Sequence, residues 1–410
     1  TRTTMDKKKP EIRFKGFEEE WVTTTLGECF QERVERSAEG ELISVTINQG
    51  VIRASDLDRI DNSSDDKSNY KVVEVGDIAY NSMRMWQGAC GYSLYKGICS
   101  PAYTVVIPQG NINVVYCFYM FKRNESLHLF RVNSQGLTSD TWNLKFPAFS
   151  QIKYNIPSVS EQEKIGTLLT TLDKLIAKLE AKLEKLRKLK QALLEKMFIN
   201  VNEGSEMPEI RFKGYPDKWE VKELREVANL RRGLTYSPDD ICKEREGIRV
   251  LRSSNVAEDI FFLSEDDVFV KPSAVDIPYL DNNDILITAA NGSLRLVGKH
   301  CLVTGIQPNS CVPGGFMLCA STESPFFLQA SMSSSWYQTF IDTYTLGGNG
   351  SIGNLSKTAL EEQNIHLPSI PEQQCVGHCF MQIDTQLSKS SIKLTKLRRI
   401  KESLLEKMFV

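Results

Sequence analysis

Two stretches of the chain carry an apolar residue at every seventh position. In the first stretch the repeat runs through Ile165, Leu172, Leu179, Leu186 and Leu193, and leucines three residues further on add a second apolar position at Leu168, Leu175 and Leu189. The second stretch repeats the pattern through Val376, Ile383, Leu397 and Leu404, with the polar Ser390 between them. A seven-residue apolar repeat is typical of helices that pack as a coiled coil. We therefore predict two long helices, at residues 158–200 and 369–410.

Each predicted helix begins at a recognisable cap. Ser158 with Glu161, and Ser369 with Glu372, have the spacing of a capping box, in which the hydroxyl and the carboxylate satisfy amides of the first turn. Pro371 falls in that first turn, where a missing N–H breaks no helical hydrogen bond. About 40 residues at 1.5 Å each make a rod about 60 Å long. We expect the two apolar stripes to pack on each other, antiparallel; the alternative, in which each helix covers only its own domain, stays open.

The chain contains an internal repeat. Residues 10–17 followed by Trp21 recur as residues 208–215 followed by Trp219, at an offset of 198. Residues 193–198 recur unchanged as residues 404–409, at an offset of 211. Two constant blocks therefore bracket a variable region in each half, and the second variable region is longer by 211 − 198 = 13 residues. This order predicts a pseudo-twofold molecule with domains at residues 1–157 and 201–368 and long helices at residues 158–200 and 369–410.

The variable regions predict mixed α and β structure. Short strand-like runs at residues 71–75 and 103–107 end at glycine, aspartate or proline turns. The segment at residues 284–287 resembles the one at residues 77–80, and each precedes a polar loop. The fold class that follows is α+β, with two mixed domains and two long helices.

Polar loops in both halves supply candidate contacts to DNA. Their amide, hydroxyl and guanidinium groups are the ones that pair with base edges and hold phosphates. Solvated turns have a similar composition, so a purely structural role stays open for each residue. The candidates in the first half are Asn81, Arg84, Gln87, Ser134, Gln135, Thr138 and Lys145. Those in the second half are Arg231, Arg232, Tyr236, Arg252, Ser254, Asn255, Asn291, Ser293, Arg295, Lys299, Asn349, Ser351 and Lys357.

The charge balance excludes a polybasic binder. The 410 residues carry 50 Lys and Arg against 52 Asp and Glu, a formal charge of −2. Residues 160–198 hold nine basic and six acidic groups, and residues 371–409 hold seven and four, so each rod is +3 and the remainder is −8. A DNA-facing surface must therefore come from local arrangement rather than from net charge.

Other signals are weak or missing. The ten cysteines include no Cys-x-x-Cys pair, and Cys375, His378 and Cys379 share a helix face that suits core packing better than a metal site. The glycine pattern at residues 348–353 follows no convincing strand and opens no long helix, so we do not expect a dinucleotide site. Neither a secretory signal nor a membrane-spanning stretch is visible, which leads us to expect a cytoplasmic protein with reduced thiols.

The doubled arrangement resembles the specificity subunit of a type I restriction-modification enzyme. The resemblance rests on the two Pro-Glu-Ile-Arg-Phe-Lys-Gly blocks with their tryptophans, the two Pro-Ser blocks with Glu-Gln, and the two Leu-Leu-Glu-Lys-Met-Phe helix ends, and it spans residues 10–409. Ser390, Pro371 and the 13-residue excess are small departures from it.

That resemblance implies two target-recognition domains held apart by an antiparallel pair of helices, each domain reading half of a bipartite, asymmetric target in double-stranded DNA. It implies a non-catalytic bacterial or archaeal chain without a cofactor of its own, whose partners are two modification subunits, which use S-adenosylmethionine, and restriction subunits, which use ATP and Mg²⁺. A freestanding DNA-binding protein and a coiled-coil scaffold that binds proteins are the alternatives.

Overall fold

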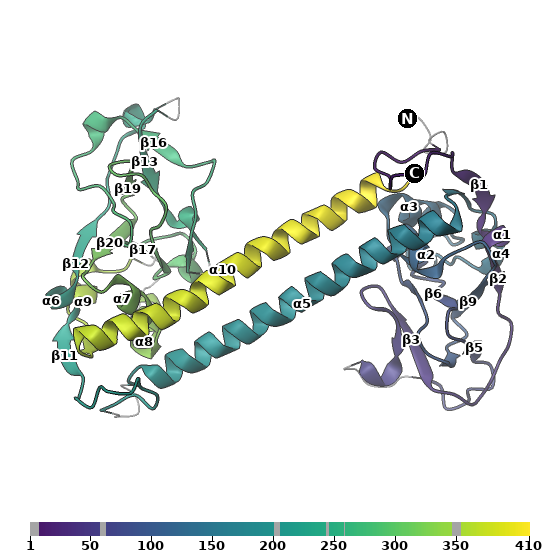
Figure 1. Ribbon diagram of the computed structural model, residues 1–410, viewed down its shortest axis with the longest axis horizontal. Coiled ribbons are helices and arrows are strands. Elements are labelled where there is room, and N and C mark those ends of the chain that lie inside the picture. Colours follow the sequence, from purple (N-terminus) through teal and green to yellow (C-terminus); the bar gives the residue numbers. More distant parts are fainter. Residues whose placement is uncertain (1–7, 58–62, 201–205, 243–245, 258, 347–353) are drawn as a thin grey trace. The chain divides into compact units, whose positions relative to one another are not determined.

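The computed structural model describes residues 8–57, 63–200, 206–242, 246–257, 259–346 and 354–410. They form two compact units, one made of Thr1–Glu180 with Lys393–Val410 and the other of Ala181–Ile392. The long helices α5 (Val159–Met197) and α10 (Ile370–Lys407) each contribute residues to both units. Both helices are drawn in Figure 1, α5 in teal and α10 in yellow. The structure thus contains the two predicted helices, within a few residues of the expected bounds; the four predicted domain boundaries stay a prediction.

Unit 1 contains three sheets. Strands β1 (Val22–Thr25) and β10 (Lys153–Ile156) form an antiparallel pair. A four-stranded antiparallel sheet has the order β2 (Phe30–Glu32), β9 (Tyr103–Pro108), β6 (Ile78–Asn81), β7 (Cys90–Tyr92). A second four-stranded sheet has the order β4 (Gly50–Arg53), β3 (Leu42–Thr46), β8 (Gly97–Cys99), β5 (Lys71–Val73), with β3 and β8 parallel. The short helices of unit 1 are α1 (Leu26–Cys29), α2 (Val114–Phe121), α3 (Asn124–Val132) and α4 (Phe146–Ser150).

Unit 2 repeats this plan. Strands β11 (Glu220–Glu223) and β21 (Asn364–Leu367) pair, and a four-stranded sheet runs β12 (Asn229–Arg232), β20 (Met317–Ser321), β17 (Ile285–Thr288), β18 (His300–Leu302). The next sheet runs β16 (Val268–Val270), β13 (Ile248–Leu251), β19 (Cys311–Pro313), again with one parallel pair. A hairpin of β14 (Val256–Ala257) and β15 (Ile260–Phe261) accompanies it. The short helices are α6 (Leu224–Val227), α7 (Pro325–Ser331), α8 (Ser335–Leu346) and α9 (Lys357–Glu361).

Equivalent contacts recur in the two units at the offsets of the sequence repeat. In unit 1 the Arg13 guanidinium donates to both carboxylate oxygens of Glu161, at 2.7 and 2.8 Å, and in unit 2 Arg211 binds Glu372 at the same two distances. The Ile12 amide donates to the carbonyl of Lys407 near the end of α10, just as the Ile210 amide donates to Lys196 near the end of α5. In each unit the segment before the first strand is therefore bound to the end of a long helix. In unit 1 that helix is α10, so the contact joins residues that lie far apart in the sequence.

Aromatic residues of the constant blocks form the matching part of each core. In unit 1 Tyr116 stacks on Phe409 at 5.2 Å and meets Trp21 edge to face at 6.4 Å. In unit 2 Phe327 contacts Phe198 at 5.6 Å and Trp219 at 6.1 Å. The repeated tryptophan and the final phenylalanine of each helix block are thus core residues that join the helix ends to the sheets.

The helices run antiparallel within each unit. Contacts in unit 1 join Asp173 to Lys401 at 2.5 Å and Glu180 to Arg398 at 2.5 Å, so the numbering rises on one helix as it falls on the other. The equivalent of the first contact in unit 2 is Lys190 to Asp384, at 2.8 Å. The predicted antiparallel packing is confirmed in each unit.

The structure corrects one part of the predicted seam. The seven-residue positions named above are buried or half-buried in both helices. However, Leu175 and Leu189 are 44% and 48% exposed, whereas Leu169 and Leu183 are 0% and 4% exposed. The second seam position therefore lies four residues after the first, and in both helices it also holds a lysine, at Lys190 and Lys401. Because each lysine has a carboxylate partner across the seam, it is accommodated there.

Candidate nucleic-acid interface

Two loops lie side by side at one end of the antiparallel sheet in each unit. In unit 1 they are residues 82–89, after β6, and residues 100–102, before β9; the Ser82 amide donates to the Ala102 carbonyl. In unit 2 they are residues 289–299, after β17, and residues 314–316, before β20; the amides of Ala289 and Ala290 donate to the Phe316 carbonyl at 2.9 and 3.1 Å. Because β6 pairs with β9 and β17 with β20, the same register brings the loops together in both units.

The loops of unit 1 and the residues beside them include all seven candidates predicted there. Trp86 meets Trp142 edge to face at 5.1 Å, and the Leu144 amide donates to the Ser82 carbonyl, so residues 82–89 contact the loop of residues 133–143. The latter is closed by two backbone hydrogen bonds between Gln135 and Asn143. This cluster brings together the exposed or half-exposed candidates Asn81, Arg84, Gln87, Ser134, Gln135, Thr138 and Lys145.

In unit 2 three candidates line one hollow of about 640 Å³. Tyr236 follows β12, Arg252 follows β13, and Asn291 follows β17. The Asn291 amide nitrogen donates to the hydroxyl of Ser253 at 2.8 Å, and its oxygen accepts from the Ser293 amide at 2.9 Å, so the side chain is held in place. Arg252 donates from one terminal nitrogen to the carbonyl of Asp266. Serines 254 and 293 are exposed close by in sequence.

Two candidates are committed to internal contacts, and we assign them structural roles instead. Asn255 is 0% exposed; its oxygen accepts from the Arg252 amide, and its nitrogen donates to the Phe262 carbonyl and to Asp267. Arg231 donates to Asp284 at 2.6 Å, to Ser321 and to a backbone carbonyl. Its equivalent in unit 1, Arg33, makes the same ion pair with Asp77. Asn255 has no exposed surface, and three internal acceptors hold the guanidinium of Arg231, so we do not place either side chain at a base edge.

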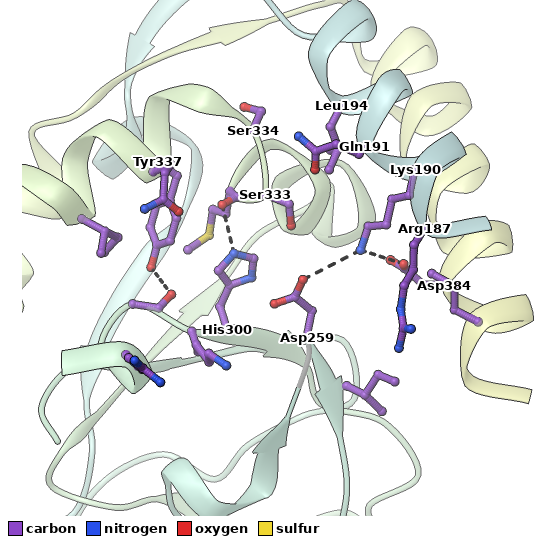
Figure 2. A pocket seen from close by; sticks show the side chains of 18 of the residues that line it. Arg187, Lys190, Gln191, Leu194, Asp259, His300, Ser333, Ser334, Tyr337 and Asp384 are labelled. Atoms are coloured by element: carbon purple, nitrogen blue, oxygen red, sulfur yellow. Dashed lines mark hydrogen bonds and ion pairs between the residues drawn. The ribbon is translucent and has the colours of Figure 1, made fainter. Parts of the chain in front are cut away.

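Arg295 and Lys299 line a different hollow, of about 620 Å³, between α5, α10 and the sheet domain of unit 2 (Figure 2). Lys190 lies 2.8 Å from Asp384 and 3.9 Å from Asp259. Burial raises the pKa of Asp384 above its ordinary value, although the ammonium of Lys190 opposes the shift. His300 is 4% exposed, and its Nε2 lies 3.0 Å from the Met332 carbonyl.

The same junction in unit 1 is filled by an aromatic ring. The Tyr119 hydroxyl donates to Asp173 at 2.7 Å, and Lys401 lies 5.7 Å from the ring centre. At the offset of 211, the position of Tyr119 corresponds to Ala330. Unit 2 has no ring at this position, so the two junctions differ in packing although their interhelical ion pairs are alike.

The remaining candidates are dispersed. Arg232 is exposed on β12, and Lys357 pairs with Glu361 one turn along α9. Asn349 and Ser351, together with the glycine pattern at residues 348–353, lie outside the described residues. Phe316, 74% exposed beside the hollow of Tyr236 and Arg252, is absent from the sequence-based candidates. Only the glycine pair before it, at Gly314 and Gly315, hinted at a tight turn there.

Other kinds of site receive no support from the described part of the chain. It contains no group of three His, Cys, Asp or Glu side chains placed to hold a metal ion. The Nδ1 of His378 lies 2.9 Å from a carbonyl of its own helix, and Cys375 lies 3.5 Å from the hydroxyl of Tyr215. None of the described helices has the length and apolarity to cross a bilayer.

Known proteins resemble this chain over most of its length. The type I restriction enzyme MjaVIII specificity subunit of Methanocaldococcus jannaschii is 23% identical over 349 residues, which cover 82% of this chain and 78% of that protein. The type I restriction enzyme EcoKI specificity subunit of Escherichia coli is 25% identical over 307 residues, or 69% of this chain and 62% of that protein.

The fold also has a solved counterpart. The crystal structure of the S subunit of a type I restriction-modification system from M. genitalium matches with a TM-score of 0.63 at 14% identity, covering 98% of this chain and 99% of the other. A family model, the type I restriction modification DNA specificity domain, matches residues 18–188 and 216–397, one match in each half of the repeat. This chain therefore belongs to the family of type I restriction modification DNA specificity domains.

Proposed function

We propose that this chain is the DNA-recognition subunit of a type I restriction-modification enzyme and performs no catalysis itself. The observation that carries the proposal is the doubled unit: two copies of one fold present equivalent loop pairs whose residues differ. Such a pair suits a target with two different half-sites, one read by each unit. Residues that contact the phosphates of the DNA would fix the register of each unit on the duplex, while the loop residues described above would read base edges.

The pair of long helices would set the distance between the half-sites. Two similar domains related by a pseudo-twofold axis can follow the pseudo-twofold symmetry of duplex DNA. A continuous helix is stiff, so its length would determine how many base pairs lie unread between the half-sites. One added heptad lengthens a helix by about 10 Å, close to the rise of three base pairs.

The chemistry would belong to partner subunits. Two modification subunits would supply methyl transfer from S-adenosylmethionine to adenine, and restriction subunits would supply Mg²⁺- and ATP-dependent translocation and cleavage. Methylation of a base inside a duplex requires that the base leave the stack, so this chain would bind DNA that is distorted near each half-site. A cytoplasmic location is part of the proposal, because the DNA and these partners are there.

The test is a map of methylated bases in cells that express the modification subunit with and without this chain. We expect a bipartite motif that appears only when the chain is present. Insertion of one heptad into each helix, after Glu180 and after Ile392, should keep both half-sites and lengthen the gap between them. If the gap stays unchanged, the long helices do not set the distance between the half-sites. If no motif appears, the chain does not have the proposed recognition role.

The same material separates the two alternatives. A freestanding DNA-binding protein would bind its sequence but direct no methylation in a reconstitution with a modification subunit. A protein-binding scaffold would give no salt-dependent, sequence-preferring shift of a duplex in a gel.

A further inference from the structure

An aromatic side chain stands exposed on a fixed backbone beside the unit 2 hollow. Phe316 is 74% exposed and lies in the turn between β19 and β20. Its carbonyl accepts from two amides, those of Ala289 and Ala290. The turn is closed by a hydrogen bond from the Met317 amide to the Gly314 carbonyl, at 2.7 Å. The ring is therefore held out into solvent by an ordered backbone.

Close packing beneath the turn holds the turn in its place at the end of the sheet. A Cβ atom on Gly233 would lie 2.0 Å from the Gly314 carbonyl oxygen, so only glycine fits where β12 ends. The Gly314 amide donates to the carbonyl of Leu251 at 2.8 Å. Backbone therefore lies directly against backbone beneath the turn, which fixes the position of the turn. A single exposed apolar ring is common on protein surfaces, so it is the hollow that Phe316 lines, rather than exposure alone, that points to a contact with a partner.

The hollow next to the ring has the chemistry of a nucleobase site. Its lining includes Tyr236, Arg252, Asn291 and Ser253, together with glycines, a threonine and apolar residues, and no carboxylate. Proteins hold unstacked bases between aromatic faces and bind their edges with guanidinium, amide and hydroxyl groups. The absence of acid among the lining residues matters because the regions outside the long helices carry a net charge of −8. Among the lining residues, Arg252 therefore presents the one charged group to the DNA, and no carboxylate there repels the phosphates.

Unit 1 lacks this ring at the equivalent position. β9 pairs with β6 through Tyr103 and Asn81, as β20 pairs with β17 through Met317 and Thr288. The residue before β9 is Ala102, whose carbonyl accepts from the Ser82 amide as that of Phe316 accepts from the Ala289 amide. Phe316 thus corresponds to Ala102, and the exposed ring is a property of unit 2 alone.

We infer that Phe316 contacts a base displaced from the stack in the half-site read by unit 2, and that the hollow beside it receives this base with its edge toward Arg252 and Asn291. The inference rests on the proposed DNA-recognition function and adds a specificity-determining residue to it. Unit 1 has no such ring to contact a base in its own half-site.

The test uses the full chain assembled with its modification subunits. Duplexes bound from a random pool define the target, and 2-aminopurine is then placed in turn at each position of both half-sites. We expect fluorescence to rise on binding at the adenine of each half-site that the modification subunits displace, and at one further position, in the unit 2 half-site alone. Phe316→Ala should abolish the rise at this further position, relax base preference in that half-site only, and weaken binding by about 5- to 150-fold, the range that loss of one aromatic stacking contact produces.

Two further variants keep the result interpretable. Phe316→Trp retains a stacking face and should preserve both the fluorescence and the base preference. Val221→Ala removes another exposed apolar side chain of unit 2, 56% exposed on β11, and should behave as the unchanged protein. The inference is refuted if Phe316→Ala keeps the affinity, preference and fluorescence, or if it weakens only the association with the modification subunits. If the unchanged protein selects no sequence, the proposed function itself fails, and the inference falls with it.

Discussion

The ion pair at the start of each long helix allows the cost of a buried contact to be measured twice in one molecule. The Glu161 side chain is 1% exposed and accepts two hydrogen bonds from Arg13, which is 14% exposed. The hydrogen bond to Glu161 raises the pKa of Arg13. In unit 2 the carboxylate of Glu372 is 0% exposed and Arg211 is 13% exposed. Both pairs tie the segment before the first strand to the first turn of a long helix.

Substitution of the arginine should lower the free energy of unfolding more than neutralisation of the glutamate does. Arg13→Met keeps the side-chain volume but leaves the Glu161 carboxylate buried without a counterion, which costs about 3–5 kcal/mol. Glu161→Gln leaves a neutral acceptor for the guanidinium, which remains partly solvated, and should cost about 1.5–3 kcal/mol. The double variant has no stranded charge, so it should be more stable than Arg13→Met alone.

Hydrogen exchange resolves the effect by unit, because a chain with two compact units need not unfold in one step. Arg13→Met should speed amide exchange in α2 about a hundred-fold to several-thousand-fold, the equivalent of 3–5 kcal/mol at about 1.4 kcal/mol per decade. Exchange in α7 should not change. Arg211→Met should give the reverse pattern. An acceleration below ten-fold, or no recovery in the double variant, would show that the pair does not stabilise the unit as argued.

Three further outcomes follow from the packing. Leu183→Ala should destabilise unit 2 by about 2–5 kcal/mol, whereas Leu189→Ala should change it by less than about 0.5 kcal/mol, and equal effects in urea unfolding would reject the corrected seam. Gly377→Ala should cost about 1–3 kcal/mol because its Cβ would lie 2.7 Å from a backbone nitrogen of α7, while Gly166→Ala, with 3.3 Å of room, should cost less in the same assay. Burial raises the pKa of Cys99 to about 12, so at pH 8 only about one part in ten thousand is thiolate, and mass spectrometry should find it unalkylated until the protein unfolds.

The sequence predicts the architecture well because the architecture depends on local and repeated signals. A seven-residue apolar period, two helix starts and a duplicated block can be recognised in the sequence without knowledge of the tertiary contacts. The second seam position could not be predicted, because Leu168 and Leu169 are both apolar and the choice between them depends on the facing helix. The structure resolves it by burying Leu169.

The candidate interface is harder to predict because contacts distant in sequence decide which polar residues are free. Arg231 and Asn255 have the composition of DNA-contacting residues, yet Asp284 and Asp267 engage them. Conversely, Phe316 looks like a core residue in sequence. It lies instead in a turn whose place depends on the close approach of Gly233 and Gly314, a tertiary contact between segments about 80 residues apart.

Under the proposed function, each unit reads one half of the target independently of the other. Its most direct test replaces residues 216–368 with the corresponding region of a related specificity subunit and maps the methylated motif of cells that carry the chimaera and the modification subunit. We predict that one half of the motif changes, while the other half and the number of intervening base pairs stay the same. A motif that changes in both halves, or in neither, would contradict the account.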